Sequence, residues 1–297
     1  MTVLERLAAG EHRPLLVVTR PDRPRGRGRK RSSPPVAEAA RALGIVVDQP
    51  DDVNAAPARE RIAAAEPEVV CICAYGGLLK EPLLSDYELF NLHPSLLPRW
   101  RGAAPIARAI EAGDESTGVS IMRPIEELDA GPVFCTRAAP IRPDDDYGSL
   151  SSRLAAIGGE LLVEALERRP EPTEQPDAGS TYAEKIGPED RRLDPALGAV
   201  ALERRVRALR PHIGAYAELV GGDRLGVIRA SVASADSQSL SAGALTWGEG
   251  RLLFGCADGA LELLEVKPAG GRAMDGAAFA RGHARALTRR PDDSSPW

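Results

Sequence analysis

A polar pair at the end of an apolar strand constrains this 297-residue chain more than any other feature. The run from Leu89 to Leu92 has the character of a buried strand. Pro94 cannot continue a central ladder, so we expect the strand to end near His93. Asn91 and His93 then lie on the same face, because side chains alternate along a strand.

An amide beside an imidazole suggests a specific chemistry. The amide can donate a hydrogen bond to an oxyanion, and the imidazole can give or take a proton. In open α/β sheets, ligands bind at the carboxyl end of the strands, where this pair lies. The simpler alternative is that Asn91 caps a turn and His93 is a half-buried structural histidine, since the pattern N-x-H is short and common.

Helical and apolar patterns alternate over the first part of the chain. We expect helices at residues 2–9, 34–43, 55–65, 103–112 and 147–168, and strands at 15–19, 45–47, 68–74, 89–93, 118–125 and 131–141. The apolar run at 68–74 is typical of a strand that is buried on both faces of a parallel sheet. This alternation predicts a doubly wound α/β domain.

The last part of the chain has a different pattern. Residues 169–180 are rich in proline and polar residues, as linkers are. A helix is expected at 199–209, followed by short strands at 225–230, 244–247, 251–255 and 260–266 that predict a small β-barrel. We therefore divide the chain into a first domain at 1–170, a linker at 171–195 and a second domain at 196–297.

The composition narrows the classes of function. Apolar residues make up 43% and charged residues 27%, as in ordinary globular proteins. No apolar run reaches the roughly 18 residues of a membrane span, and no signal-peptide pattern precedes the first helix, so we expect a cytoplasmic protein. The four cysteines and four histidines lack metal-ligand spacing, which predicts chemistry without a metal and no structural disulfide.

The positive charge is concentrated in one short segment. Between Arg20 and Arg31 there are seven cationic residues and one acid, whereas the whole chain has a formal net charge of −5. If the partner is RNA, this segment must supply much of the attraction. The alternative is a solvated connection whose arginines bind nothing specific.

The string at residues 90–106, FNLHPSLLPRWRGAAPI, resembles the signature of the tetrahydrofolate-dependent formyltransferases. Its end, WRGAAPI, is similar to the branch of that family that acts on methionyl-tRNA. The resemblance continues in PDRPRGRGRK at 21–30, AYG at 74–76, LDAGPV at 128–133 and TYAEKI at 181–186. It implies a Rossmann-like core followed by an OB-like barrel. The implied reaction moves a formyl group from 10-formyltetrahydrofolate to the amino group of initiator methionyl-tRNA, for translation initiation.

The resemblance also implies roles for particular residues. The family's catalytic residues fall on Asn91, His93 and Asp129. The implied contacts with the folate co-substrate fall on Tyr75, Gly76, Ser95, Leu96, Leu97 and Pro98. The implied contacts with tRNA fall on Arg23, Arg25, Arg27, Arg29 and Lys30, and the second domain is expected to bind tRNA as well.

The reaction predicts how the catalytic side chains act. Formyl transfer to an amine passes through a tetrahedral oxyanion, which Asn91 would stabilise, with His93 as a second donor and proton carrier. Asp129 would orient the imidazole, favour its charged form and relay the proton. The alternatives are a turn aspartate in LDAG and a strand-ending turn at Tyr75 and Gly76.

Two departures from the family pattern leave other functions open. Family members begin with a strand and a G-T-x-x-F loop, whereas this chain starts inside the following helix, so we expect Met1 not to be the natural start. Residues 210–216, RPHIGAY, stand where relatives more often have P-W-P-x-x-W. The competing functions are formyl transfer to a nucleotide-linked amino sugar and tRNA binding without catalysis. We expect a monomer in either case.

We predict that Arg27 contacts the end of the tRNA acceptor stem. In the resembling family the middle arginine of this loop enters the stem, and the flanking Gly26 and Gly28 leave its side chain a free path into a groove. Arg27→Ala should therefore reduce formylation of initiator methionyl-tRNA far more than Arg20→Ala or Arg31→Ala. It should also weaken discrimination against tRNAs with a paired first position. Matched losses in all three variants, with discrimination intact, would leave only a general electrostatic role.

Overall fold

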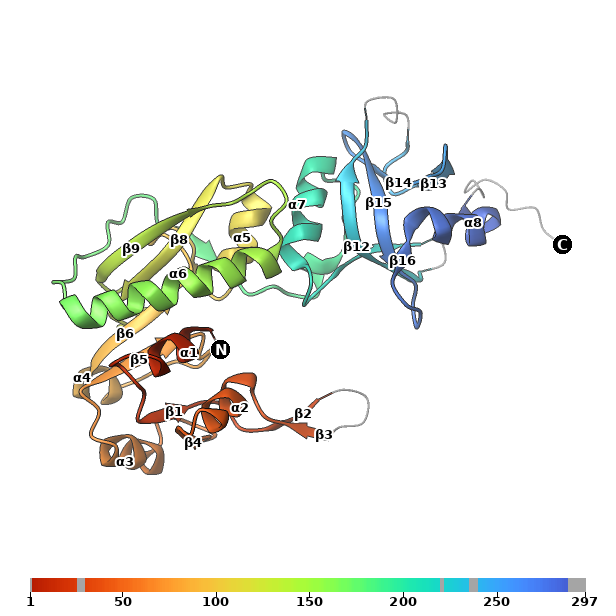
Figure 1. Ribbon diagram of the computed structural model, residues 1–297. Coiled ribbons are helices and arrows are strands. Elements are labelled where there is room, and N and C mark those ends of the chain that lie inside the picture. The colour runs from red at the N-terminus through yellow and green to blue at the C-terminus, as the bar shows by residue number, and fades with distance from the viewer. Residues whose placement is uncertain (1, 26–29, 220–221, 235–239, 288–297) are drawn as a thin grey trace. The chain divides into compact units, whose positions relative to one another are not determined.

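The computed structural model describes residues 2–25, 30–219, 222–234 and 240–287. The chain forms two compact units. The first contains the chain up to Pro105 with Ser116–Pro140 and Ser151–Glu184, and the second contains Ile106–Glu115, Ile141–Leu150 and the chain from Lys185 onward. Figure 1 shows the elements by label. None of the helices in the described part of the chain combines the length and the apolar character that a membrane span requires.

The described residues of the first unit form one four-stranded sheet and three separate pairs of short strands. β5 (Val69–Cys73), β6 (Glu88–His93), β8 (Ser116–Met122) and β9 (Val133–Pro140) form one four-stranded sheet in that order, with β5 parallel to β6 and the other neighbours antiparallel. β1 (Leu16–Val18) pairs in parallel with β4 (Val46–Asp48). β2 (Arg23–Arg25) and β3 (Lys30–Ser32) form an antiparallel hairpin, and β7 (Arg101–Gly102) pairs in parallel with β10 (Tyr182–Ala183).

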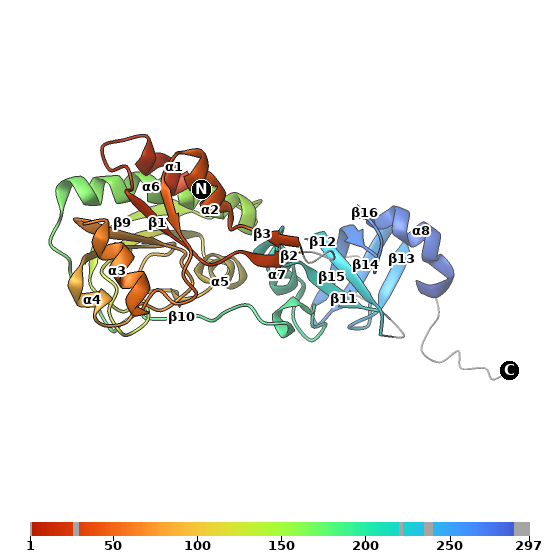
Figure 2. The same ribbon diagram turned by 90° about the horizontal axis from the view of Figure 1, so that it is seen from below.

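Helices cover these strands (Figure 2). Their bounds are α1 (Thr2–Ala8), α2 (Pro35–Ala42), α3 (Ala56–Ala64), α4 (Leu83–Asp86) and α6 (Tyr147–Arg168), whereas α5 (Pro105–Ala112) belongs almost entirely to the second unit. The long α6 lies along the four-stranded sheet, and Gly158 brings its backbone onto Leu92 of β6. Arg137 of β9 pairs with Glu164 of α6 at 2.7 Å. This close packing fixes the strand that ends in His93.

The second unit contains a sheet with the strand order β11-β12-β15-β14-β13. Its elements are η1 (Glu189–Arg191), α7 (Ala199–Leu209), β11 (Ala215–Glu218), β12 (Arg224–Val232), β13 (Leu245–Gly248), β14 (Arg251–Cys256), β15 (Gly259–Lys267), β16 (Met274–Asp275) and α8 (Gly276–Leu287). Apolar side chains of α7, α8 and the sheet share one core that includes Leu202, Leu252 and Phe279. In the described residues, β11 and β13 do not pair with each other, so the predicted barrel is not closed.

The turn at 210–214 packs against the start of α6. Arg210 Nε donates to Asp146 Oδ2 at 2.5 Å, and Arg207 Nη1 donates to the carbonyl of Asp145 at 2.8 Å. The rings of His212 and Tyr147 meet edge to face, with centroids 5.9 Å apart. This turn departs from the family pattern in sequence, yet it is held by a charge-assisted hydrogen bond and a ring contact.

Most elements follow the sequence pattern, and α6 and α7 have the predicted bounds. The prediction was wrong about β5. Its residues are half-exposed rather than buried on both faces, and Cys73 is exposed. β5 pairs with β6 along one edge, and no other described strand pairs with its second edge, so it lies at the border of the sheet. The hairpin β2–β3, the short β11 and the helix α8 were not predicted.

We predict that Gly118→Ala destabilises the protein by about 1–3 kcal/mol. A Cβ at this position of β8 would meet the carbonyl of Arg137 and lie 2.5 Å from Leu96 Cδ2. Gly282 of α8 is the matched control, because its Cβ would enter open space and alanine is the better helix former by about 1 kcal/mol. Urea unfolding of both variants measures the difference. A Gly118→Ala variant as stable as the wild type would show that the backbone can move away.

Candidate active site

His93 ends β6 with its imidazole buried, only 4% exposed. Its Nε2 lies 2.8 Å from the carbonyl oxygen of Trp100. A carbonyl only accepts hydrogen bonds, so Nε2 carries a proton and donates it. The other ring nitrogen, Nδ1, faces Asp129 Oδ2 at 3.5 Å. In the neutral imidazole, Nδ1 is therefore the nitrogen that can accept a proton.

Asp129 lies in the loop between β8 and β9 and meets His93 from the other side. Its Oδ2 accepts a hydrogen bond of 2.9 Å from the backbone N–H of Gly102, the last residue of β7. Its φ angle is 51°, in the left-handed region that aspartate tolerates better than most residues. The carboxylate is largely buried, with 12% of its side chain exposed. Three separate segments thus bring His93 and Asp129 together.

Asn91 lies two residues before His93 on the same strand, as predicted, and it is half-buried. Its amide Nδ2 lies 3.4 Å from Met122 Sδ, across the ladder on β8. A thioether sulfur is a weak acceptor. The amide therefore keeps its capacity to donate to a stronger acceptor, such as an oxyanion.

Two opposing effects set the protonation of His93. Burial lowers the pKa of His93 below its ordinary value of 6.5, although Asp129 and the hydrogen bond to Trp100 act in the opposite direction. Asp129 thus favours the charged form, as the sequence predicts. Desolvation outweighs that attraction, because the ring has almost no contact with water. The surroundings of His93 therefore favour the neutral imidazole, which can accept a proton.

The SLLP segment forms a turn packed on β8. Ser95 is fully buried, and its Oγ donates to the carbonyl of Arg99 at 2.6 Å, so the hydroxyl is already engaged inside the turn. The backbone N–H of Leu97 donates to Ser120 Oγ at 3.1 Å, and Leu96 packs over Gly118. Leu96, Leu97 and Pro98 are half-buried. These three residues can present apolar surface, whereas Ser95 supports the turn.

The other predicted site residues lie in two further segments. Tyr75 packs against the apolar cluster that includes Ile62 and Leu83, and the carbonyl of Gly76 accepts a hydrogen bond from the guanidinium of Arg20. In the basic segment, Arg23 is exposed on β2, and Arg25 and Lys30 lie in the strands of the hairpin. Arg27 and Arg29 lie outside the described residues.

The sequence analysis missed the residues that support Asp129. Gln175, in the segment that was expected to be a linker, donates from Nε2 to the carbonyl of Asp129 at 2.8 Å. Its Oε1 accepts a hydrogen bond of 3.0 Å from Nε of the buried Arg101. Thr181 Oγ1 accepts from the backbone N–H of Trp100 at 2.9 Å. The available sequence signal was that Arg101 and Thr181 lie within the stretches 90–106 and 181–186, which resemble the family.

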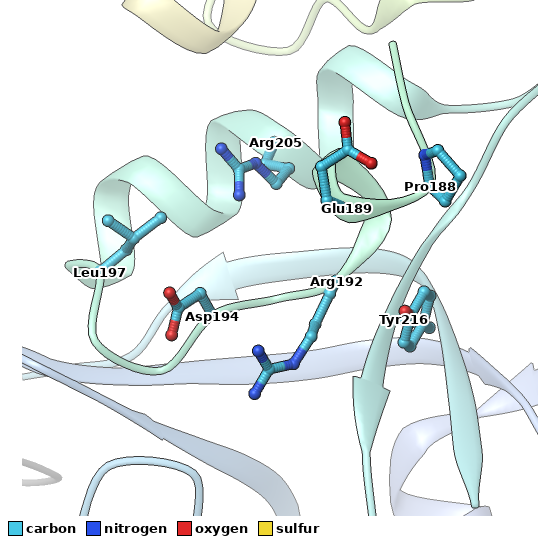
Figure 3. Close-up of a pocket in the computed structure, with 7 residues that line it drawn as sticks. All are labelled: Pro188, Glu189, Arg192, Asp194, Leu197, Arg205 and Tyr216. Carbon is cyan, nitrogen blue, oxygen red and sulfur yellow. The ribbon is translucent and has the colours of Figure 1, made fainter.

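The described residues of the second unit line two cavities that could bind a partner. One, of about 470 Å³, lies beside α7 and is shown in Figure 3. Its lining residues are Pro188, Glu189, Arg192, Asp194, Leu197, Arg205 and Tyr216. The larger, of about 1020 Å³, is a groove along β12 that includes the exposed cations Arg224, Arg229 and Lys267. Arg224 stacks on the Tyr216 ring, 4.4 Å from its centroid.

Comparisons with known proteins agree with this arrangement. The family model described as formyl transferase matches residues 2–166, and the model of the formyl transferase C-terminal domain matches residues 185–284. The chain belongs to the formyl transferase family. It is 42% identical to methionyl-tRNA formyltransferase from Halorhodospira halophila, over 94% of this chain and 91% of the relative. It is 43% identical to the protein of that name from Thermus thermophilus, over 92% of this chain and 89% of the relative.

Solved structures share the fold of this formyl transferase. HypX from Aquifex aeolicus in complex with tetrahydrofolic acid matches 84% of this chain with a TM-score of 0.58 and 21% identity. The match covers 44% of HypX, so the present chain spans less than half of that protein. An N-formyltransferase from Helicobacter canadensis, in complex with folinic acid and dTDP-3-aminofucose, matches 88% of this chain and 93% of its own, with a TM-score of 0.63 and 15% identity.

We predict that His93 titrates below 6.5 in an NMR pH titration of the imidazole signals, because burial lowers its pKa. Asp129→Asn should lower the pKa further, since it removes the charge that favours the imidazolium. The unfolded chain binds this proton more readily than the folded one. The free energy of unfolding should therefore fall as the pH drops below about 6.5. A midpoint at or above 6.5 would contradict the assignment.

Proposed function

We propose that this chain transfers a formyl group from 10-formyltetrahydrofolate to the amino group of initiator methionyl-tRNA. The observation that carries the proposal is the group formed by Asn91, His93 and Asp129 at the end of β6. The family shares a formyl transfer chemistry, and relatives that are 42% and 43% identical over nearly the whole chain carry the name methionyl-tRNA formyltransferase. The reaction belongs to translation initiation, which also gives the expected cytoplasmic location.

The site supports a division of labour among the three side chains. The substrate amine attacks the formyl carbon, forms a new C–N bond and generates an oxyanion. The amide of Asn91, which contacts only the weak acceptor Met122 Sδ, can donate a hydrogen bond to that oxyanion. The C–N bond to the folate then breaks, and the proton lost by the amine passes to the folate nitrogen. His93 Nδ1 and Asp129 face each other at 3.5 Å, so this pair is the proposed carrier of that proton.

The apolar turn beside this group is the proposed contact for the folate. Leu96, Leu97 and Pro98 offer half-buried apolar surface that suits a flat ring system, while Ser95 keeps the turn in shape. Tyr75 and Gly76 remain proposed contacts on a separate loop. No residue of this proposed site is a metal ligand in the proposed chemistry.

Two cationic surfaces are the proposed contacts for tRNA. The hairpin β2–β3 carries Arg23 and Arg25 on one strand and Lys30 on the other, and Arg27 and Arg29 belong to the same sequence run. In the second unit, Arg224, Arg229 and Lys267 are exposed along one groove. Such clusters attract a phosphate backbone even on a chain with a formal net charge of −5. The second domain, at 196–297, is thus a proposed RNA-binding module beside a proposed catalytic domain at 1–170.

We predict that Asn91→Ala, His93→Ala and Asp129→Asn each lower turnover about 100-fold or more, the scale of losing an oxyanion donor or an acid–base group. The measurement is formylation of methionyl-tRNA with 10-formyltetrahydrofolate. Filter binding of tRNA should change little, because the three side chains act on the reacting atoms. The variant Glu60→Ala, which changes an exposed residue outside the site, is the control for effects of expression and purification. A folded variant that kept more than about a third of the activity would remove that residue from the mechanism.

A further inference from the structure

Gln175 lies in the extended segment between α6 and β10, outside both stretches that the family models match. It nevertheless uses both ends of its side-chain amide, the nitrogen on the loop of Asp129 and the oxygen on Arg101 of β7. Nε2 donates to the carbonyl of Asp129 at 2.8 Å and to that of Gly131 at 2.7 Å. Oε1 accepts from Arg101 Nε at 3.0 Å. A segment that reads as a linker thus makes three hydrogen bonds at the candidate active site.

These bonds close a ring around Asp129. Arg101 and Gly102 are the two residues of β7. Gly102 donates its N–H to the carboxylate of Asp129, while Arg101 donates to Gln175, which in turn donates to the backbone of Asp129. Asp129 is therefore held at its side chain and at its main chain from one pair of adjacent residues. A non-glycine residue with a φ of 51° persists where its surroundings hold it in this way.

The chemistry of the ring requires an amide at position 175. The two carbonyls of Asp129 and Gly131 need N–H donors, and Arg101 needs an acceptor. Only asparagine and glutamine carry two N–H donors and an acceptor on one planar group. A carboxylate would satisfy Arg101 and leave both carbonyls without a donor. An apolar side chain would satisfy neither.

We infer that Gln175 is a positioning residue for the proposed formyl transfer, because it holds the loop that keeps the Asp129 carboxylate facing His93 Nδ1, 3.5 Å away. The inference rests on the proposed function of Asp129. It also makes a separate structural claim about the pair itself, which does not depend on the identity of the substrate.

Other charged groups lie beside the same loop and belong in any test. Glu127 Oε1 is 3.8 Å from Arg101 Nη1 and accepts a hydrogen bond of 3.4 Å from the hydroxyl of Tyr182. Glu127 is exposed, with 63% of its side chain accessible, so water weakens its effect on His93. Asp129 is the charged group that faces the imidazole directly.

The test compares two variants. Gln175→Met has a side chain of similar length and removes all three hydrogen bonds, whereas Gln175→Glu keeps only the acceptor for Arg101. Glu174→Ala is the matched control, because Glu174 is the exposed neighbour in the same segment. Each variant is studied in the full chain. The measurements are the NMR titration of His93 and the steady-state kinetics of formyl transfer.

Gln175→Met should release Asp129 and lower the pKa of His93 further below 6.5, in the direction of Asp129→Asn. Both Gln175 variants should lower kcat about 10- to 100-fold, the scale of a misplaced catalytic group, with the KM for tRNA within about twofold. In the Asp129→Asn background, Gln175→Met should add little further loss. Glu174→Ala should match the wild type in both measurements.

A His93 titration unchanged in Gln175→Met but shifted in Asp129→Asn would overturn the positioning role, as would losses in kcat that multiply in the double variant. Wild-type activity for Gln175→Glu would assign the effect to Arg101 instead. The titration needs no substrate. A wild-type chain that formylates no tRNA would therefore reject the proposed function, while the titration still decides the role of Gln175.

Discussion

The hydrogen bond from His93 Nε2 to the carbonyl of Trp100 is the interaction on which the site depends. It links the end of β6 to the far end of the turn that follows, so one contact closes that turn and orients the ring. It also settles which nitrogen carries the proton in the neutral imidazole, and it leaves Nδ1 facing Asp129. The geometry of the turn and the chemistry of the histidine thus have the same cause.

Irregular backbone near a buried strand end needs partners for its polar groups. Here they come from short hydroxyl side chains. Ser120 Oγ of β8 donates to the carbonyl of Ser95 and accepts from the N–H of Leu97, while Thr181 accepts from Trp100. Ser120 joins the turn to β8, and Thr181 joins it to the residue just before β10. Hydrogen bonds to these side chains therefore hold the turn in place, although the turn itself has no strand ladder.

Much of this arrangement can be predicted from the sequence. Apolar periodicity locates α6 and α7, and the alternation along β6 puts Asn91 and His93 on one face. Periodicity does not describe bonds between segments far apart in the chain, so the contact of Gln175 with Asp129 was not foreseen. The direction of the His93 pKa shift was also missed, because it depends on how deeply the ring is buried, and a sequence pattern lists neighbours without their exposure. A barrel was expected from short strands separated by turns and from the family resemblance, and neither says whether the ends of a sheet meet.

The segment at 167–184 lies between the stretches that the two family models match, yet it supplies Gln175, Thr181 and the strand that pairs with β7. The boundary between the two family models is therefore not the boundary of the segment set that forms the candidate active site. Recombination between members of such a family, natural or engineered, has a preferred junction beyond Ala183. A crossover at the end of α6 would combine His93 and Asp129 from one parent with Gln175 and Thr181 from the other. The hydrogen bonds between the two parts would then have to be compatible.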